Sequence, residues 1–355
     1  MRYVYLIRHG ELDLPDTKKR CYSRTELSLS PRGIEQGKEL CAWARTRGIE
    51  AVYTSPLGRC RETAALIASG TLPVHAVNAL REVDVGEWEG LTFDEIRERW
   101  PTVYAARGNK MSEVAPPGGE SFYRAAVRFN DALQDIMSEH KGNLAVVAHS
   151  GVIRSWLLHF AELGGGSMFS IPVPYSGVAT LCLDGNTLLN VTAGTRVSRA
   201  PSASEIEEYY RRCNTPAEVI AHCRAVADRA GELVEKNGIT CNRELLHAAC
   251  LLHDMCRTDG RNHPKSVAQI LTMDGYPALA GIIVRHHDLP VRASAETELL
   301  YLSDKLVAGT EVVSLEERFS QSRQKCADAA AAKNWERRMH DAVNIVRKYH
   351  LEGIV

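Results

Sequence analysis

The chain has 355 residues, of which 45% are hydrophobic and 25% charged, and its formal net charge at pH 7 is −1. This length favours two domains, and the near-neutral charge predicts that no nucleic-acid polymer is a partner. No segment approaches the run of about 18 apolar residues that spans a membrane, no signal peptide is expected, and ten scattered cysteines without a CxxC pair predict reduced thiols and a cytoplasmic location.

The first 195 residues alternate short strand-like segments with helical patterns. Strands are predicted at 3–7, 51–54, 144–148, 178–183 and 187–192. Helices are predicted between them, at 31–47, 57–69, 92–100 and 119–140. This alternation predicts an α/β layered sheet over residues 1–195.

After residue 195 the strand signals stop. Residues 196–204, with Pro201 among serines and alanines, are predicted as a linker, and residues 205–355 as an all-helical domain. Helices are expected at 205–212, 216–236, 243–256, 264–273, 277–287, 296–308 and 316–349. The last helix has an aliphatic face that either packs within the chain, which is the commoner case, or contacts a second copy, so a homo-oligomer stays open.

An arginine and a histidine stand at the end of the first predicted strand. Arg8-His9-Gly10 directly follows the apolar run 3–7, which places it at the carboxyl end of a strand, where α/β proteins gather their ligands. A histidine there is a candidate nucleophile, and a neighbouring guanidinium is a good phosphate ligand. Three further segments follow in the chain, at 54–59, 80–90 and 146–151.

Together these four segments resemble those of the histidine phosphatase superfamily, also called phosphoglycerate mutase-like. The resemblance implies a three-layer α/β sandwich and phosphoryl transfer through a histidine, with no metal or other cofactor for that step. It maps His9 to the nucleophile and Glu82 to the general acid and base. Arg8, Arg59 and His149 map to the residues that bind the phosphate and stabilise the transferring group.

Some positions depart from the family pattern. Leu12 and Pro15 stand where a Thr or Ser and an Asn commonly help to hold phosphate, and Ser23 and Glu26 replace a Gly and an Asp. The missing Trp-Asn pair argues against a phosphoglycerate mutase and favours a phosphomonoesterase nearest to the α-ribazole phosphatase branch. The departures also leave an alternative open, in which the first domain only binds a phosphorylated ligand and the second domain is the sole enzyme.

Histidines concentrate in the second predicted domain, where six of the thirteen fall between residues 222 and 287. His253-Asp254 follows the apolar helical run 245–252, and imidazole with carboxylate suits Mn, Fe, Zn or Mg. The pattern resembles the HD domain family of metal-dependent phosphohydrolases. By that resemblance, one divalent metal is held by His222, His253, Asp254 and Asp304. A second ion would be held by His263 with His286 or His287.

The resemblances together predict two hydrolases on one chain. Both would cleave small-molecule phosphate esters, with successive steps on a nucleotide-like or cofactor-like metabolite as the reason for their fusion. Two alternative hypotheses concern the second domain. In one it is a metal-stabilised scaffold, and in the other it is a di-iron oxygenase. His247 is expected to pack or to support a ligand, and Lys305 either contacts phosphate or is solvated, with solvation slightly favoured.

Overall fold

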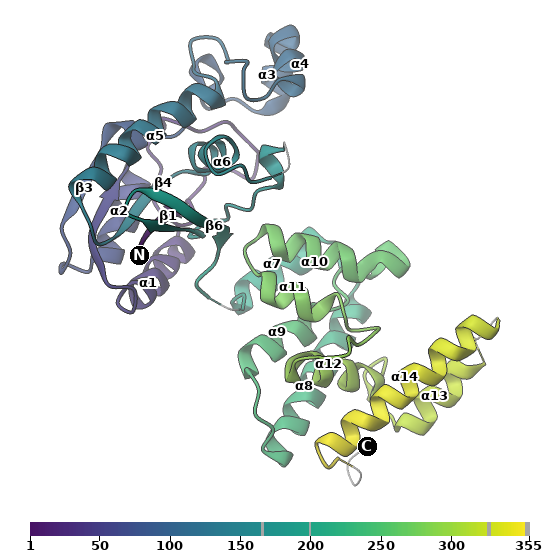
Figure 1. Cartoon of the computed structure of the whole chain (residues 1–355). Helices are drawn as coiled ribbons and strands as arrows, with labels where there is room; N and C mark the ends of the chain where they lie inside the picture. Colours follow the sequence, from purple (N-terminus) through teal and green to yellow (C-terminus); the bar gives the residue numbers. More distant parts are fainter. Residues whose placement is uncertain (165–166, 199, 325–327, 352–355) are drawn as a thin grey trace. The chain divides into compact units, whose positions relative to one another are not determined.

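The computed structural model describes residues 1–164, 167–198, 200–324 and 328–351 (Figure 1). The chain forms two compact units, Met1–Val197 with Met273–Gly275 and Ser198–Thr272 with Tyr276–Val355. Helix α7 (Ala203–Arg212) begins inside the predicted linker 196–204. Within the described ranges, none of the helices has the length and apolarity needed to cross a membrane.

A six-stranded mixed sheet forms the centre of the first unit, in the order β3-β2-β4-β1-β5-β6. Its strands are β1 (Arg2–Arg8), β2 (Ile49–Thr54), β3 (Val74–Ala76), β4 (Asn143–Ala148), β5 (Val178–Asp184) and β6 (Thr187–Thr195). The first four strands pair in parallel, whereas β5 and β6 are antiparallel to their neighbours. The prediction missed β3, because its three residues are all exposed and show no alternation.

Helices cover both faces of this sheet. These are α1 (Pro31–Ala44) and α2 (Gly58–Ala68) on one face and α5 (Phe122–Glu139) and α6 (Ser150–His159) on the other. The unit also contains α3 (Phe93–Arg99) and α4 (Pro101–Asn109), which lie away from the sheet in Figure 1, and the 3-10 helices η1 (Asn78–Leu80), η2 (Gly86–Trp88) and η3 (Met168–Ser170). Along β1, Val4 and Leu6 join the core that α5 and α6 cover, while Tyr5 and Ile7 join the core under α1 and α2. The predicted three-layer sandwich is confirmed.

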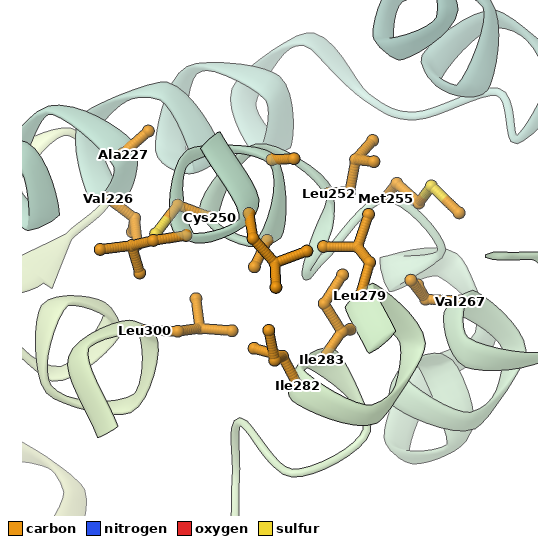
Figure 2. Close-up of a cluster of buried hydrophobic side chains, with 14 of the residues drawn as sticks. Val226, Ala227, Cys250, Leu252, Met255, Val267, Leu279, Ile282, Ile283 and Leu300 are labelled. Carbon is orange, nitrogen blue, oxygen red and sulfur yellow. The ribbon is translucent and has the colours of Figure 1, made fainter. Parts of the chain in front are cut away.

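The second unit is built from helices. They are α7, α8 (Ala217–Asn237), α9 (Arg243–Leu252), α10 (His263–Met273), α11 (Pro277–Ile283), α12 (Ala295–Lys305), α13 (Leu315–Arg323) and α14 (Ala329–Lys348), with the 3-10 helix η4 (Arg257–Asn262) and short strands β7 (Val307–Ala308) and β8 (Glu311–Val312). Figure 2 shows side chains from α8 to α12 meeting in one apolar core, among them Val226, Leu252 and Leu279. The predicted helical bundle is confirmed.

Three predicted helices of the second unit differ most from the structure. The helices expected at 243–256 and 277–287 end at Leu252 and Ile283, and beyond each end a histidine turns its ring back onto a carbonyl of the last turn. Nδ1 of His253 lies 2.8 Å from the Cys250 carbonyl and Nδ1 of His286 lies 2.7 Å from that of Ile283, in competition with main-chain donors. The helix expected at 316–349 is two helices, α13 and α14, and its residues 325–327 lie outside the described residues.

Candidate functional site

His9 directly follows β1 and is buried in the first unit. Its Nδ1 lies 2.8 Å from the carbonyl oxygen of Gly10, and because a carbonyl only accepts, Nδ1 carries the ring proton and Nε2 keeps its lone pair. Burial, with the positive charges of Arg8 and Arg59, lowers the pKa of His9 well below its ordinary value. The ring is therefore neutral at physiological pH, as a nucleophile requires.

Arg59 and His149 are bonded to each other beside this histidine. The Arg59 Nε donates to Nδ1 of His149 at 3.2 Å, and its terminal nitrogens donate to the carbonyls of Thr25 at 2.9 Å and Ser23 at 2.8 Å. Nε2 of His149 lies 2.8 Å from the hydroxyl of Ser55. Both ring nitrogens of His149 thus have protein partners, while each terminal nitrogen of Arg59 keeps one N–H for a ligand.

Arg8 is held by contacts that no local motif indicates. Its Cζ lies 3.7 Å from the centroid of the Tyr175 ring, and its Nη1 donates to the carbonyl of Val173 at 2.9 Å. The Nε of Arg8 is buried and has no hydrogen-bond partner among the described residues. A buried donor requires an acceptor, and a phosphate oxygen is a suitable one.

Glu82 lies at the amino-terminal end of α6, the helix that begins after His149. Its Oε1 accepts from the backbone N–H groups of Val83 and Val152, each at 2.9 Å, and its Oε2 accepts from that of Gly151 at 3.0 Å. The N–H groups of Gly151 and Val152 lack partners within the helix, and they hold the Glu82 carboxyl group in place. Oε2 has one hydrogen bond fewer than Oε1, so Oε2 is the oxygen available to exchange a proton.

Glu89 organises the segment that meets Arg59, and the sequence assigned it no role. Its carboxylate accepts from the backbone N–H groups of Ser23, Arg24 and Thr25 and from the hydroxyls of Ser23 and Thr25. Ser23 stands where the family usually has a glycine, and its hydroxyl donates one of these hydrogen bonds to Glu89. The only signal in the sequence was the Trp-Glu-Gly motif around Glu89.

The remaining departures have structural roles outside the phosphate site. Glu26 accepts from the backbone N–H of Gly58 at 2.9 Å and so satisfies the start of α2. Leu12 forms an isolated antiparallel bridge with Leu29, and Pro15 is exposed.

In the second unit, the predicted ligand residues converge on one cluster. The ligand atoms of His222, His253 and Asp304 lie within 4.8 Å of one another, and so do those of His263, His286 and His287. Asp254 lies between the two triads. Its Oδ1 is 2.8 Å from Nε2 of His263, and its Oδ2 is 3.8 Å from Nε2 of His253.

The imidazoles of this cluster share one orientation. Four of them place Nδ1 within 2.6 to 2.8 Å of a backbone carbonyl: His222 at Gly309, His253 at Cys250, His263 at Gly260 and His286 at Ile283. Nδ1 is therefore the donor, and Nε2 directs its lone pair at the cluster. Nε2 of His253, His263 and His286 is buried with no hydrogen-bond partner among the described residues.

This donor set fits a divalent cation. The 2.8 Å contact sets a lone pair of His263 against a carboxylate oxygen of Asp254, an arrangement that a shared cation relieves. Burial, reinforced by the neighbouring His286, lowers the pKa of His287 to about 3, so that ring is neutral as a ligand must be.

Two other residues differ from expectation. Lys305 was slightly favoured as solvated, but its Nζ lies 2.8 Å from Oδ2 of Asp304 and its side chain is largely buried. His247 was expected to pack or to support a ligand, whereas it is exposed on α9. Arg257, which the sequence did not single out, places its Nη1 3.2 Å from Oδ2 of Asp254.

Comparisons with known proteins find matches for both units. A family model described as "Histidine phosphatase superfamily (branch 1)" matches residues 4–193, and one described as "HD domain" matches residues 219–309. Two Arabidopsis thaliana proteins are similar to the chain. "Phosphoglycerate mutase-like protein 4" is 34% identical over 157 residues, which are 43% of this chain and 68% of that protein. "Metal-independent phosphoserine phosphatase" is 35% identical over 167 residues, which are 45% and 68%.

More distant relatives cover the same unit. The "6-phosphofructo-2-kinase/fructose-2,6-bisphosphatase" of Gallus gallus is 32% identical over 163 residues, 45% of this chain but only 33% of that protein. The solved structure "Mycobacterial hydrolase 2" has a TM-score of 0.50 at 22% identity, covering 58% of this chain and 95% of the other, and shares the fold. The alpha-ribazole phosphatase from Shigella flexneri has a TM-score of 0.48 at 26% identity, covering 57% and 98%. The chain belongs to the histidine phosphatase superfamily, and it carries an HD domain after that unit.

Proposed function

We propose that the first unit hydrolyses small phosphate monoesters through His9 and that the second unit is a phosphohydrolase dependent on a divalent metal. The observation that carries the first part is the Nε2 lone pair of neutral His9, next in the chain to Arg8, whose buried Nε has no hydrogen-bond partner among the described residues. The substrates we propose are nucleotide-like or cofactor-like phosphate esters, and the location we propose for the protein is the cytoplasm.

In the proposed reaction, Nε2 of His9 attacks phosphorus while the ester P–O bond breaks. Arg8 and Arg59 neutralise the phosphate oxygens, and protonated Glu82 gives its proton to the leaving oxygen. The Glu82 carboxylate then takes a proton from water, whose oxygen attacks phosphorus as the N–P bond breaks. The products are an alcohol and inorganic phosphate, and His9 returns to its neutral form.

The experiment that tests this is a trapping measurement with chelator present. Wild type, His9→Gln and the control His75→Gln, a change at an exposed histidine, are incubated with phosphoserine and nucleoside 5′-monophosphates and quenched in alkali. We expect phosphate release and a phosphorylated His9 peptide from wild type and from the control, and neither from His9→Gln.

The alternative is that the first unit binds a phosphorylated ligand without turnover. Two observations favour it: both nitrogens of His149 are already bonded, and Leu12 and Pro15 supply no hydroxyl or amide side chain to a phosphate. Ester binding to wild type, measured by calorimetry, without phosphate release or a phosphorylated peptide would favour this alternative.

For the second unit, we propose that His222, His253, Asp254 and Asp304 hold one cation and that His263, His286 and His287 hold another with Asp254 shared. A divalent cation supplies Lewis-acid chemistry that activates water and neutralises phosphate oxygens. The protein residues orient the ligand rings, and Lys305 and Arg257 add positive charge at the two carboxylates. Phosphate-ester cleavage that survives His9→Ala and is lost on chelation would support this role, whereas oxygen uptake by an iron-loaded form would favour the oxygenase.

The coupling of the two halves is tested in the full chain. His9→Ala disables the first proposed site and His253→Gln the second, and each variant is assayed on one panel of phosphate esters. We expect the product of one site to be a substrate of the other. Substrate classes with no overlap would contradict the coupling.

A further inference from the structure

A cavity of about 260 Å³ opens beside the proposed general acid of the first unit. Glu82 is one of its lining residues, together with Ser23, whose carbonyl accepts from Arg59. In the proposed reaction Glu82 protonates the leaving oxygen, so the remainder of the leaving group extends into the space that Glu82 lines. The lining of this cavity therefore selects the alcohol part of the ester.

Most of the charge that lines this cavity is already paired. Arg24 forms an ion pair with Asp84, and Arg128 forms one with Glu120 at 2.6 Å. The carboxylate of Glu82 is held by backbone N–H groups. Two further arginines of the lining, Arg81 and Arg124, remain.

Arg81 and Arg124 are the unpaired cations of the cavity. Among the residues that the structure describes, neither side chain makes an ion pair or hydrogen bond; Arg81 is half-buried and Arg124 is exposed. Arg124 stands in the first turn of α5, where positive charge opposes the helix dipole, so its charge does not serve the helix. Two guanidinium groups without a counter-ion, in a cavity that the proposed general acid Glu82 also lines, form a site for an anion.

We propose that Arg81 and Arg124 bind a second anionic group, a carboxylate or a phosphate, on the leaving group of the ester that His9 cleaves. This proposal rests on the function proposed above and narrows its substrates to phosphate monoesters that carry a further negative charge. The guanidinium fork matches a carboxylate or phosphate through paired hydrogen bonds, which a neutral hydroxyl does not reproduce.

The test compares phosphate esters with the same three-carbon chain that differ in the group at the far end, which is neutral in one and anionic in two. The probes are 3-hydroxypropyl phosphate, 2-carboxyethyl phosphate and propane-1,3-diol bisphosphate, assayed in chelator. For wild type we expect kcat/KM to be about tenfold higher for the charged esters than for the hydroxyl ester. The ratio should fall to about one in Arg81→Met/Arg124→Met and stay at the wild-type value in Arg45→Met, which removes an exposed arginine outside the cavity. The carboxylate and phosphate arms show which anion is preferred.

Equal rates for charged and neutral esters in wild type, or a preference that persists in the double variant, would overturn the proposal. Turnover of none of the esters would contradict the phosphatase function instead. In that case, calorimetry measures binding of the same esters to the His9→Ala protein, with and without the two arginine substitutions. This binding still decides whether the anion site exists. Tighter binding of the charged esters that is lost with the two arginine substitutions supports the anion site. Equal affinities for charged and neutral esters overturn it.

Discussion

Arg59 donates its Nε–H to Nδ1 of His149 at 3.2 Å, so two residues expected to grip the phosphate are bonded to each other without it. The same guanidinium donates to the carbonyls of Ser23 and Thr25, and Glu89 holds that segment from the other side. The orientation of Arg59 is therefore set by the protein, and we expect a bound phosphate to meet a fixed pair of N–H groups.

Arg59→Lys should reduce kcat/KM for phosphate monoesters by about 100-fold, because a lysine cannot keep the bonds to His149 and to both carbonyls while also contacting phosphate. Arg61→Lys, on the same helix but exposed, is the matched control and should stay near wild type. Steady-state phosphate release measures both. A mild effect of Arg59→Lys would mean that Arg59 does not contact the transferring group.

Tyr175→Leu should weaken inhibition by inorganic phosphate or vanadate by about fivefold, because the ring that stacks on Arg8 contributes about 1 kcal/mol to holding the guanidinium. Tyr175→Phe keeps that ring and should bind the inhibitors nearly as wild type does. Inhibition constants for the two variants are compared at one pH. Equal constants for leucine and phenylalanine would contradict the stacking role.

Glu89→Gln should raise KM by about tenfold with a smaller change in kcat, because an amide NH₂ replaces one acceptor oxygen and faces N–H donors of residues 23–25. The loosened segment then no longer fixes Arg59 for binding. Glu87→Gln, an exposed position in the same motif, is the control. A fall in kcat alone, with KM unchanged, would argue against a positioning role.

The buried histidines of the first unit should make its stability depend on pH. Burial, with nearby positive charge, lowers the pKa of His9, so the unfolded chain binds a proton that the folded chain refuses. Stability is then present above the unfolded pKa of about 6.5 and lost as pH falls, by about 1.4 kcal/mol per unit for each group.

His9→Gln removes one such group. Between pH 7.5 and pH 5.5 its free energy of unfolding should fall by about 1.4 kcal/mol less than that of wild type. Denaturant titrations at each pH provide the measurement. The transition of the first unit is the one that added phosphate shifts. Identical slopes with pH would show that His9 keeps an ordinary pKa.

Purified wild type should carry about two divalent ions per chain, and Asp254→Asn should lose most of both, because Asp254 lies between the two triads. His263→Gln should retain about one ion. Elemental analysis by mass spectrometry after dialysis measures the content, with His247→Gln, at an exposed histidine of the same unit, as the control. Full metal content in Asp254→Asn would contradict the shared carboxylate.

Local motifs were enough to predict the residues at element ends, such as His9 after β1 and Glu82 in its loop, because each motif carries its own turn and strand. They could not predict Tyr175 or Val173 against Arg8, since more than 160 residues of chain separate them and only the pairing of β1 with β5 brings them together. The ends of α9 and α11 were missed for a related reason. Periodicity continues through His253 and His286, while the side-chain bonds that stop the helices depend on where each ring must point.

The main-chain carbonyls that hold four imidazoles of the second unit have a consequence for metal exchange. Each of these rings loses its rotational freedom when the chain folds, and an arriving ion orders none of them. The affinity of the cluster then reflects the chemistry of the ion more than the entropy of its ligands. We therefore expect ions of different elements to replace one another at the proposed site without refolding of the chain.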